Sequence, residues 1–213
     1  MKGINTFTLK LIAVFAMLID HIGLLLFPEC SILRVVGRLA FPIFAYALAE
    51  GFVYTKNIKK YLIRLGIFAF VSEVPFDLVV SGKWIDFELQ NIFFTLFFAL
   101  AALALMEKTT NVFLKMLIGT IVTLLAGGAC FDYGCMGILM VFLFYYLREK
   151  KMWQVFAIAI LLLLTSGGIQ LFAMLAFIPI LMHNRKQGPK WKLFFYLFYP
   201  IHLLLIYIVY LIL

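Results

Sequence analysis

Residues 9–27 read LKLIAVFAMLIDHIGLLLF, an apolar stretch interrupted by Lys10, Asp20 and His21. At a rise of about 1.5 Å per residue, a helix over these residues can cross the roughly 30 Å hydrocarbon core of a bilayer. The stretch is too long for the apolar region of a signal peptide, and it ends in Pro-Glu-Cys rather than in a small-residue cleavage site. It therefore predicts a first membrane-spanning helix that stays in the protein.

The rest of the chain has the same character. Hydrophobic residues make up 66% of the 213 residues and charged residues 13%, against about 45–50% and 25% in soluble domains, so lipid must solvate most of the surface. No polar linker divides the chain, which predicts one domain over residues 1–213. We expect an all-α polytopic transmembrane bundle of about nine spans, with eight to ten allowed.

Charged clusters and Gly or Pro breaks delimit the predicted spans, which are residues 8–27, 33–54, 60–80, 89–106, 112–128, 134–147, 152–166, 169–182 and 191–212. The turn at Ser166-Gly167-Gly168 leaves open whether 152–182 forms a hairpin that does not fully cross. Cys130 and Cys135 are close enough in sequence to be bridged, although three unpaired cysteines are the favoured interpretation.

The basic residues predict the orientation in the membrane. Of the 18 Lys and Arg residues, 15 fall in alternate loops and helix ends, and the other three are Arg34, Arg38 and Lys83. By the positive-inside rule this asymmetry predicts a cytoplasmic N-terminus and a multi-pass protein of the plasma membrane. The net charge of +8 is then mostly a topology signal. Nucleic-acid binding is not expected, because the basic residues are dispersed rather than gathered in a stripe.

Titratable side chains inside the apolar segments indicate a functional cavity. They are Asp20, His21, Arg38, Glu50, Glu73, Asp77 and His202. Each costs about 2.5–3.5 kcal/mol at the bilayer centre on insertion scales, so they must be paired, neutralised or in contact with water. One or two could serve as polar contacts between helices. Most of them, with Gln90, Asn91 and the loop residue Asp132, are expected in one layer between mid-membrane and the outer surface.

Two spacings refine the expected site. Lys10 and His21 are eleven residues apart, which places them on one helix face about 16.5 Å apart along the axis. A basic group at the cytoplasmic mouth would then lie beneath an imidazole in the membrane, although Lys10 alone also suits a membrane anchor. Glu73 and Asp77 are four residues apart and share a face, where two carboxylates repel. Either one of them is protonated, or a cation such as Arg38 lies close.

The motifs resemble the TraX family in order along nearly the whole chain. They are Leu18-Ile19-Asp20-His21-Ile22-Gly23, Gly37-Arg38-Leu39-Ala40-Phe41-Pro42-Ile43-Phe44, Ala49-Glu50-Gly51-Phe52, Ser72-Glu73-Val74-Pro75-Phe76-Asp77, Gln90-Asn91, Asp132-Tyr133-Gly134 and Tyr199-Pro200-Ile201-His202. The family's named member acetylates the N-terminus of conjugative pilin, so the resemblance implies a membrane acetyltransferase that uses acetyl-coenzyme A. The spacing of Lys10 and His21, with ten residues between them, also looks like the basic-x10-His motif of acyltransferase family three.

With this activity, acetyl-CoA is expected to enter from the cytoplasm, with its phosphates near Lys10, Lys56, Lys59, Lys60 and Arg64. His21 would be the general base, and a covalent acetyl-imidazole is the variant. The expected catalytic set is His21, Arg38 and Asp20. Asp20 lies about 100° around the helix from His21 and suits a supporting role.

The remaining polar residues are expected to bind the acceptor or to support the catalytic residues. They are Glu50, Glu73, Asp77, Gln90, Asn91, Asp132 and His202. Arg38, Gln90 or Asn91 would stabilise the developing oxyanion or bind the acceptor. For His202, a second proton carrier and a satisfied core histidine are both open. No metal is expected, because the His and acidic residues show no ligand spacing on one helix.

The acceptor is expected to be an extracytoplasmic amine or hydroxyl, on a pilin-like peptide, a peptide N-terminus or a glycan. A different class of protein, a small proton-coupled transporter, is the alternative, because buried acids and histidines also form proton relays. The two halves of the chain show no inverted repeat, which many transporters have.

Overall fold

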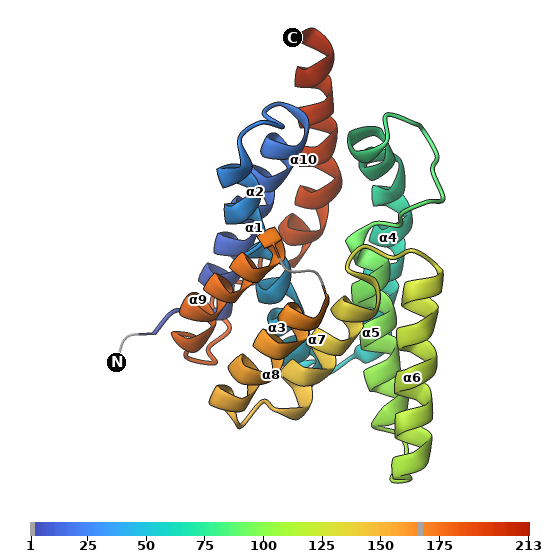
Figure 1. Ribbon diagram of the computed structural model, residues 1–213. Coiled ribbons are helices and arrows are strands. Elements are labelled where there is room, and N and C mark those ends of the chain that lie inside the picture. The colour runs from blue at the N-terminus through green and yellow to red at the C-terminus, as the bar shows by residue number, and fades with distance from the viewer. Residues whose placement is uncertain (1–2, 166–167) are drawn as a thin grey trace.

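The described chain is helical (Figure 1). The computed structural model describes residues 3–165 and 168–213. Its elements are α1 (Thr6–Leu25), α2 (Ser31–Gly37), α3 (Ala40–Tyr54), α4 (Ile58–Val80), α5 (Ile92–Met106), α6 (Val112–Gly128), α7 (Gly134–Tyr146), α8 (Lys151–Thr165), the 3-10 helix η1 (Gly168–Ala176), α9 (Phe177–Leu181) and α10 (Lys192–Ile212). The β-type contacts within these ranges are two isolated bridges. The all-α prediction is confirmed.

Three of these helices are long and apolar enough to cross a membrane: Thr6–Leu25, Ser31–Tyr54 and Lys192–Ile212. Ile92–Met106, Val112–Gly128, Gly134–Tyr146, Met152–Leu161 and Gly168–Leu181 are shorter apolar helices. Several apolar helices in one chain indicate a multi-pass membrane protein. The observed helix ends agree with the predicted segments to within a few residues. Of the predicted turn Ser166-Gly167-Gly168, residues 166 and 167 lie outside the described residues.

The predicted span 33–54 contains a break. α2 ends at Gly37 and α3 begins at Ala40, so Arg38 and Leu39 separate them. Pro42 has no backbone N–H and cannot supply the helical partner for the carbonyl of Arg38. The backbone N–H of Arg38 lies 3.2 Å from both the Arg34 and Val35 carbonyls, which tightens the turn before the break. The sequence indicated the length of this span, and Pro42 indicated a kink just below Arg38; the structure has a full break between two helices there.

α3 and α7 lie in the middle of the bundle (Figure 1), between a group formed by α1, α2 and α10 and a group formed by α4, α5 and α6. α3 packs against α1 and α7, and α10 packs against both α1 and α4. The last helix therefore joins the two groups, although its neighbours come from the first third of the chain.

The two ends of the bundle differ in charge. We call the end at which α1, α4, α6 and α10 begin the basic end, and the end at which α2, α5 and α7 begin the acidic end. At the basic end, the Ile4 N–H donates to Met182 (3.0 Å) and the Asn184 N–H donates to Ile4 (2.9 Å). At the acidic end, the Gln90 N–H donates to Cys130 (2.8 Å) and the Asp132 N–H donates to Gln90 (2.8 Å).

The three cysteines are free thiols, as the favoured interpretation had it.

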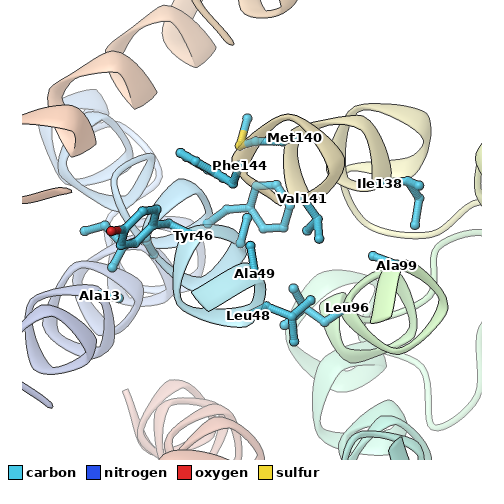
Figure 2. Packing of buried hydrophobic residues seen from close by; sticks show 14 of the residues in the cluster. Ala13, Tyr46, Leu48, Ala49, Leu96, Ala99, Ile138, Met140, Val141 and Phe144 are labelled. Carbon is cyan, nitrogen blue, oxygen red and sulfur yellow. The ribbon is translucent and has the colours of Figure 1, made fainter. Parts of the chain in front are cut away.

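The apolar core surrounds α3. Figure 2 shows Leu48 of α3 beside Leu96 of α5, Ala49 of α3 toward Val141 of α7, and Tyr46 of α3 on the side of Ala13 of α1. The Tyr46 ring also lies edge-on to Phe144 of α7. Alanines recur where these helices meet, and Ala99 and Ala102 are fully buried. Small residues let helix backbones approach closely, which supplies packing energy where lipid provides no hydrophobic drive between helices. The core therefore leaves little room for larger side chains.

We expect Ala99→Leu to lower the free energy of unfolding by about 1–3 kcal/mol, because its added atoms have no space between α5 and its neighbours. Thermal unfolding of the protein in detergent measures this change. Ala101→Leu, at a partly exposed position of the same helix, is the matched control. Equal midpoints for the two variants would contradict tight packing at Ala99.

Candidate functional site

A pair of buried histidines joins α1 to α10. His21 and His202 are 9% and 4% exposed. His21 Nδ1 lies 2.9 Å from His202 Nε2, and His202 Nδ1 lies 2.7 Å from the carbonyl oxygen of Phe198. The two helices begin at the same end and run side by side, so residues 181 positions apart meet.

These contacts determine where the protons lie in the neutral pair. A carbonyl oxygen can only accept, so His202 Nδ1 carries its proton and donates to Phe198. His202 Nε2 then accepts from His21 Nδ1–H. The lone pair of His21 is therefore on Nε2, where a base or nucleophile needs it.

The same chain of contacts favours one of the two roles left open for His202. Its Nδ1 ends on the Phe198 carbonyl, which cannot take up a proton. His202 is thus better suited to orienting the His21 ring than to carrying a proton away from it. A carbonyl or carboxylate commonly orients a functional imidazole in this way.

The Asp20 carboxylate lies between two arginines. Arg34 donates to Oδ2 at 2.6 Å, and Arg38 donates to Oδ1 at 2.7 Å and to Oδ2 at 2.8 Å. Gly37 makes this approach possible, because a Cβ there would lie 1.9 Å from Asp20 Oδ1. Asp20 therefore connects α1 to α2 and holds both cations, instead of contacting the neighbouring His21.

Glu73 and Asp77 have separate partners. The Asn91 side chain donates to the Glu73 carboxylate, and the Asp86 N–H donates to Asp77 Oδ2 at 2.9 Å. Of the two alternatives for this pair, a neighbouring Arg38 is not what the structure has, because the Arg38 guanidinium donates to Asp20. Glu73 Oε1 is buried and has no hydrogen-bond partner in the described part of the chain.

The turn between α6 and α7 brings a further acid to the acidic end. Thr95 Oγ1 donates to the carbonyl of Asp132 at 2.5 Å. Tyr133 has a left-handed φ of 59°, and its ring stacks on Phe41 with centroids 3.9 Å apart. Burial raises the pKa of the Asp132 carboxyl to about 6, and the charge of Arg38 opposes this rise. Asp132 is therefore easier to protonate than an exposed aspartate.

A cavity of about 650 Å³ enters the bundle from the basic end. Its inner end reaches Met17, Phe93 and Tyr199, and the Tyr199 ring centroid is 6.1 Å from that of His21. Its basic lining residues are Lys10, Lys56, Lys60, Arg64, Lys190 and Lys192, and none of the described residues that line it is acidic. Such a concentration of one charge in a partly apolar cleft attracts anions.

The structure does not bring all the predicted site residues together. Lys59 does not line the cavity that holds the other four predicted donor-binding residues. Glu50 lies near the basic end, where Arg148 Nε donates to it at 2.7 Å, and so it is separate from the acids of the acidic end. Gln90 is engaged by its own loop, since its side-chain amide donates to the Phe87 carbonyl at 3.0 Å.

Sequence reasoning did not assign a role to four residues that border the site: Arg34, Tyr199, Lys190 and Lys192. Tyr199 precedes His202 by three residues, so the helical period placed both on one face of α10. Arg34 precedes Arg38 by four residues, so the helical period also predicted that these two arginines share a face. The two lysines were counted only for topology, because nothing in the sequence relates the start of α10 to the start of α1.

The chain is similar to proteins of known families over most of its length. The family described as TraX protein matches residues 6–210. The probable fimbrial assembly protein FimC, serogroup H1, of Dichelobacter nodosus is 32% identical over 231 aligned positions, covering 95% of this chain and 94% of that protein. An uncharacterised protein of Rickettsia prowazekii is 47% identical over 55 residues, 26% of this chain and 22% of that protein. No solved structure matches.

We expect Asp20→Asn to destabilise the protein by about 3–5 kcal/mol, because it leaves buried arginines without their counter-charge. The thermal unfolding midpoint in detergent measures the effect. Lys83→Ala is the matched control, since it removes the exposed ion pair with Asp86 and should change the midpoint little. Similar midpoints for both variants would mean that Asp20 does not hold α1 to α2 in this way.

Proposed function

The chain belongs to the TraX family, and we propose that it is an integral acetyltransferase of the plasma membrane. It transfers the acetyl group of cytoplasmic acetyl-CoA to an amine or hydroxyl acceptor on the other side of the membrane. One observation carries this proposal: a basic cavity leads from one end of the bundle to the neighbourhood of an oriented imidazole.

The chemistry of the cavity supports a coenzyme A thioester as the donor. Lysines and arginines without competing acids suit the phosphates, and the volume of about 650 Å³ is within the range of small-molecule sites, roughly 300–1,000 Å³. Tyr54, Tyr61 and Trp191 border the outer part of the cavity and offer flat apolar surfaces to a base. Lys10 lies about 16.5 Å below His21 along α1, so an extended thioester arm would join them.

The distribution of charge supports the orientation. With the basic end in the cytoplasm, the chain obeys the positive-inside rule, and the cavity opens toward the cellular acetyl-CoA. We propose nine crossings with a cytoplasmic N-terminus. Several of these helices have 13–17 residues and reach about 20–25 Å, so the membrane would be thin around them.

The proton transfers of the reaction need one base, Nε2 of His21. The acceptor N–H or O–H gives its proton to Nε2 as its heteroatom attacks the thioester carbon, and the carbonyl electron pair moves to oxygen. When the carbonyl re-forms, the C–S bond breaks and the thiolate takes the proton from the imidazolium. The products are the acetylated acceptor and coenzyme A, and His21 returns to its neutral state.

The acidic end supports an amine acceptor of the pilin type. Five acidic residues lie there: Glu73, Asp77, Asp86, Glu88 and Asp132. Among the described residues, Glu73 Oε1 has no hydrogen-bond partner. The positive-inside rule does not account for these acids, because acidic residues contribute little to topology. They would attract a cationic peptide N-terminus. The similar protein of Dichelobacter nodosus is named for fimbrial assembly, which agrees with a pilin-type partner.

We expect His21→Ala to abolish acetyl transfer while acetyl-CoA still binds, because the substitution removes the base and leaves the basic cavity intact. Release of free thiol from acetyl-CoA, with and without a synthetic peptide that has a free N-terminal amine, measures turnover. Calorimetric titration with acetyl-CoA measures binding. Wild-type turnover in the variant would remove His21 from the mechanism, and an absence of turnover in the wild-type protein would contradict the proposed function itself.

Two neighbouring lysines test the donor site. Lys60 lines the cavity and Lys59 does not. We expect Lys60→Gln to raise the KM for acetyl-CoA by roughly 3–30-fold, since a charged hydrogen bond contributes about 1–2 kcal/mol. Lys59→Gln is the control and should leave KM unchanged. An equal effect of the two substitutions would mean that the phosphates lie outside this cavity.

A further inference from the structure

We infer that Tyr199 is a catalytic residue, whose hydroxyl donates a hydrogen bond to the carbonyl oxygen of the acyl donor and stabilises the oxyanion formed on attack. The inference rests on the proposed function, and it identifies the hydrogen-bond donor for the oxyanion of the transfer reaction. Acyl transfer places a full charge on the former carbonyl oxygen, and an oriented donor at that position is usually a large contributor to the rate.

The donors expected from the sequence are engaged elsewhere. Arg38 binds both oxygens of Asp20. The Asn91 amide donates to Glu73 and to the Ala69 carbonyl, and its oxygen accepts from the Phe93 N–H. Moving either side chain to an oxyanion would leave a buried charge or a helix end without its partner. Neither residue lines the donor cavity.

Tyr199 lies where the donor cavity ends. It is 3% exposed and lines the cavity together with Met17 and Phe93. Its ring lies edge-on to Phe93, with centroids 5.2 Å apart, and 6.1 Å from the His21 ring. A thioester that enters from the basic end would therefore reach Tyr199, with the His21 ring beside Tyr199 rather than in the cavity lining.

The first turn of α5 borders the cavity beside Tyr199. Ile92, the first residue of α5, and Phe93 line the cavity together with Tyr199. The first N–H groups of a helix have no partner within it, and the positive end of the α5 dipole adds to the stabilisation of negative charge at this place.

Tyr199 takes part without exchanging its proton. As the acceptor attacks the carbonyl carbon and gives its proton to His21, the carbonyl electron pair moves to oxygen, and Tyr199 O–H shortens its hydrogen bond to that oxygen. When the carbonyl re-forms, the C–S bond breaks and the thiolate takes the proton from His21. The phenol remains protonated throughout.

The test is Tyr199→Phe in the full-length protein, assayed for thiol release from acetyl-CoA with the synthetic amine peptide. We expect kcat to fall by about 10²–10³-fold while KM and the calorimetric Kd for acetyl-CoA stay within about two-fold of wild type, as for the loss of an oxyanion donor. Tyr207→Phe on the same helix removes a hydroxyl outside the cavity and should retain full activity.

The outcomes separate this inference from the proposed function. Wild-type kcat in Tyr199→Phe, with wild-type protein active, overturns the role of Tyr199 and leaves the acetyltransferase proposal in place. A rise in KM and Kd without a change in kcat also overturns the inference, because Tyr199 would then contribute to binding of acetyl-CoA and not to the chemical step. An inactive wild-type protein refutes the proposed function first.

Discussion

The carboxylate of Asp20, shared by Arg34 and Arg38, is the interaction on which the rest of the structure depends. Each of these charges would be strongly unfavourable alone in an apolar interior. Their contact holds α1 against α2 and requires the glycine at position 37. Because successive residues of a helix point about 100° apart, fixing Asp20 toward the arginines turns His21 toward α10. The ion cluster thus positions the imidazole without contacting it.

The bundle separates two kinds of charge along its length. The basic end surrounds an anion-attracting cavity. The acidic end gathers carboxylates, among which Glu73 and Asp77 accept from an amide and a backbone N–H rather than from cations. The histidine pair lies between them. This division fits the meeting of an anionic donor and a cationic acceptor from opposite sides. It also explains why the charged residues are tolerated, since most of them lie near an end of the bundle or have a partner.

Much of the fold was predictable because helix boundaries are local. Charged clusters and Gly or Pro breaks placed the ends of α4, α6 and α7 within two residues. Pro42 indicated a kink just below Arg38, and the structure has a break there between α2 and α3. In the site, the eleven-residue spacing placed Lys10 and His21 on one face of α1, and of the two only Lys10 is among the residues that line the cavity. Arg38 was considered as a neighbour of Glu73 and Asp77, and it binds Asp20 instead. The carboxylates of Asp20, Glu73 and Asp77 were all possible partners, and only packing distinguishes among them.

The sequence by itself determined that the chain is an all-helical membrane protein, which of its ends is basic, and that titratable groups lie within its apolar segments. Each of these properties follows from composition or from the period of one helix. The tertiary structure alone decided that His21 meets His202, that Asp20 takes both arginines, and that Tyr199 lies at the inner end of the basic cavity. These are contacts between helices distant in the chain, and helical periodicity specifies the face of a residue but not the helix that will cover it.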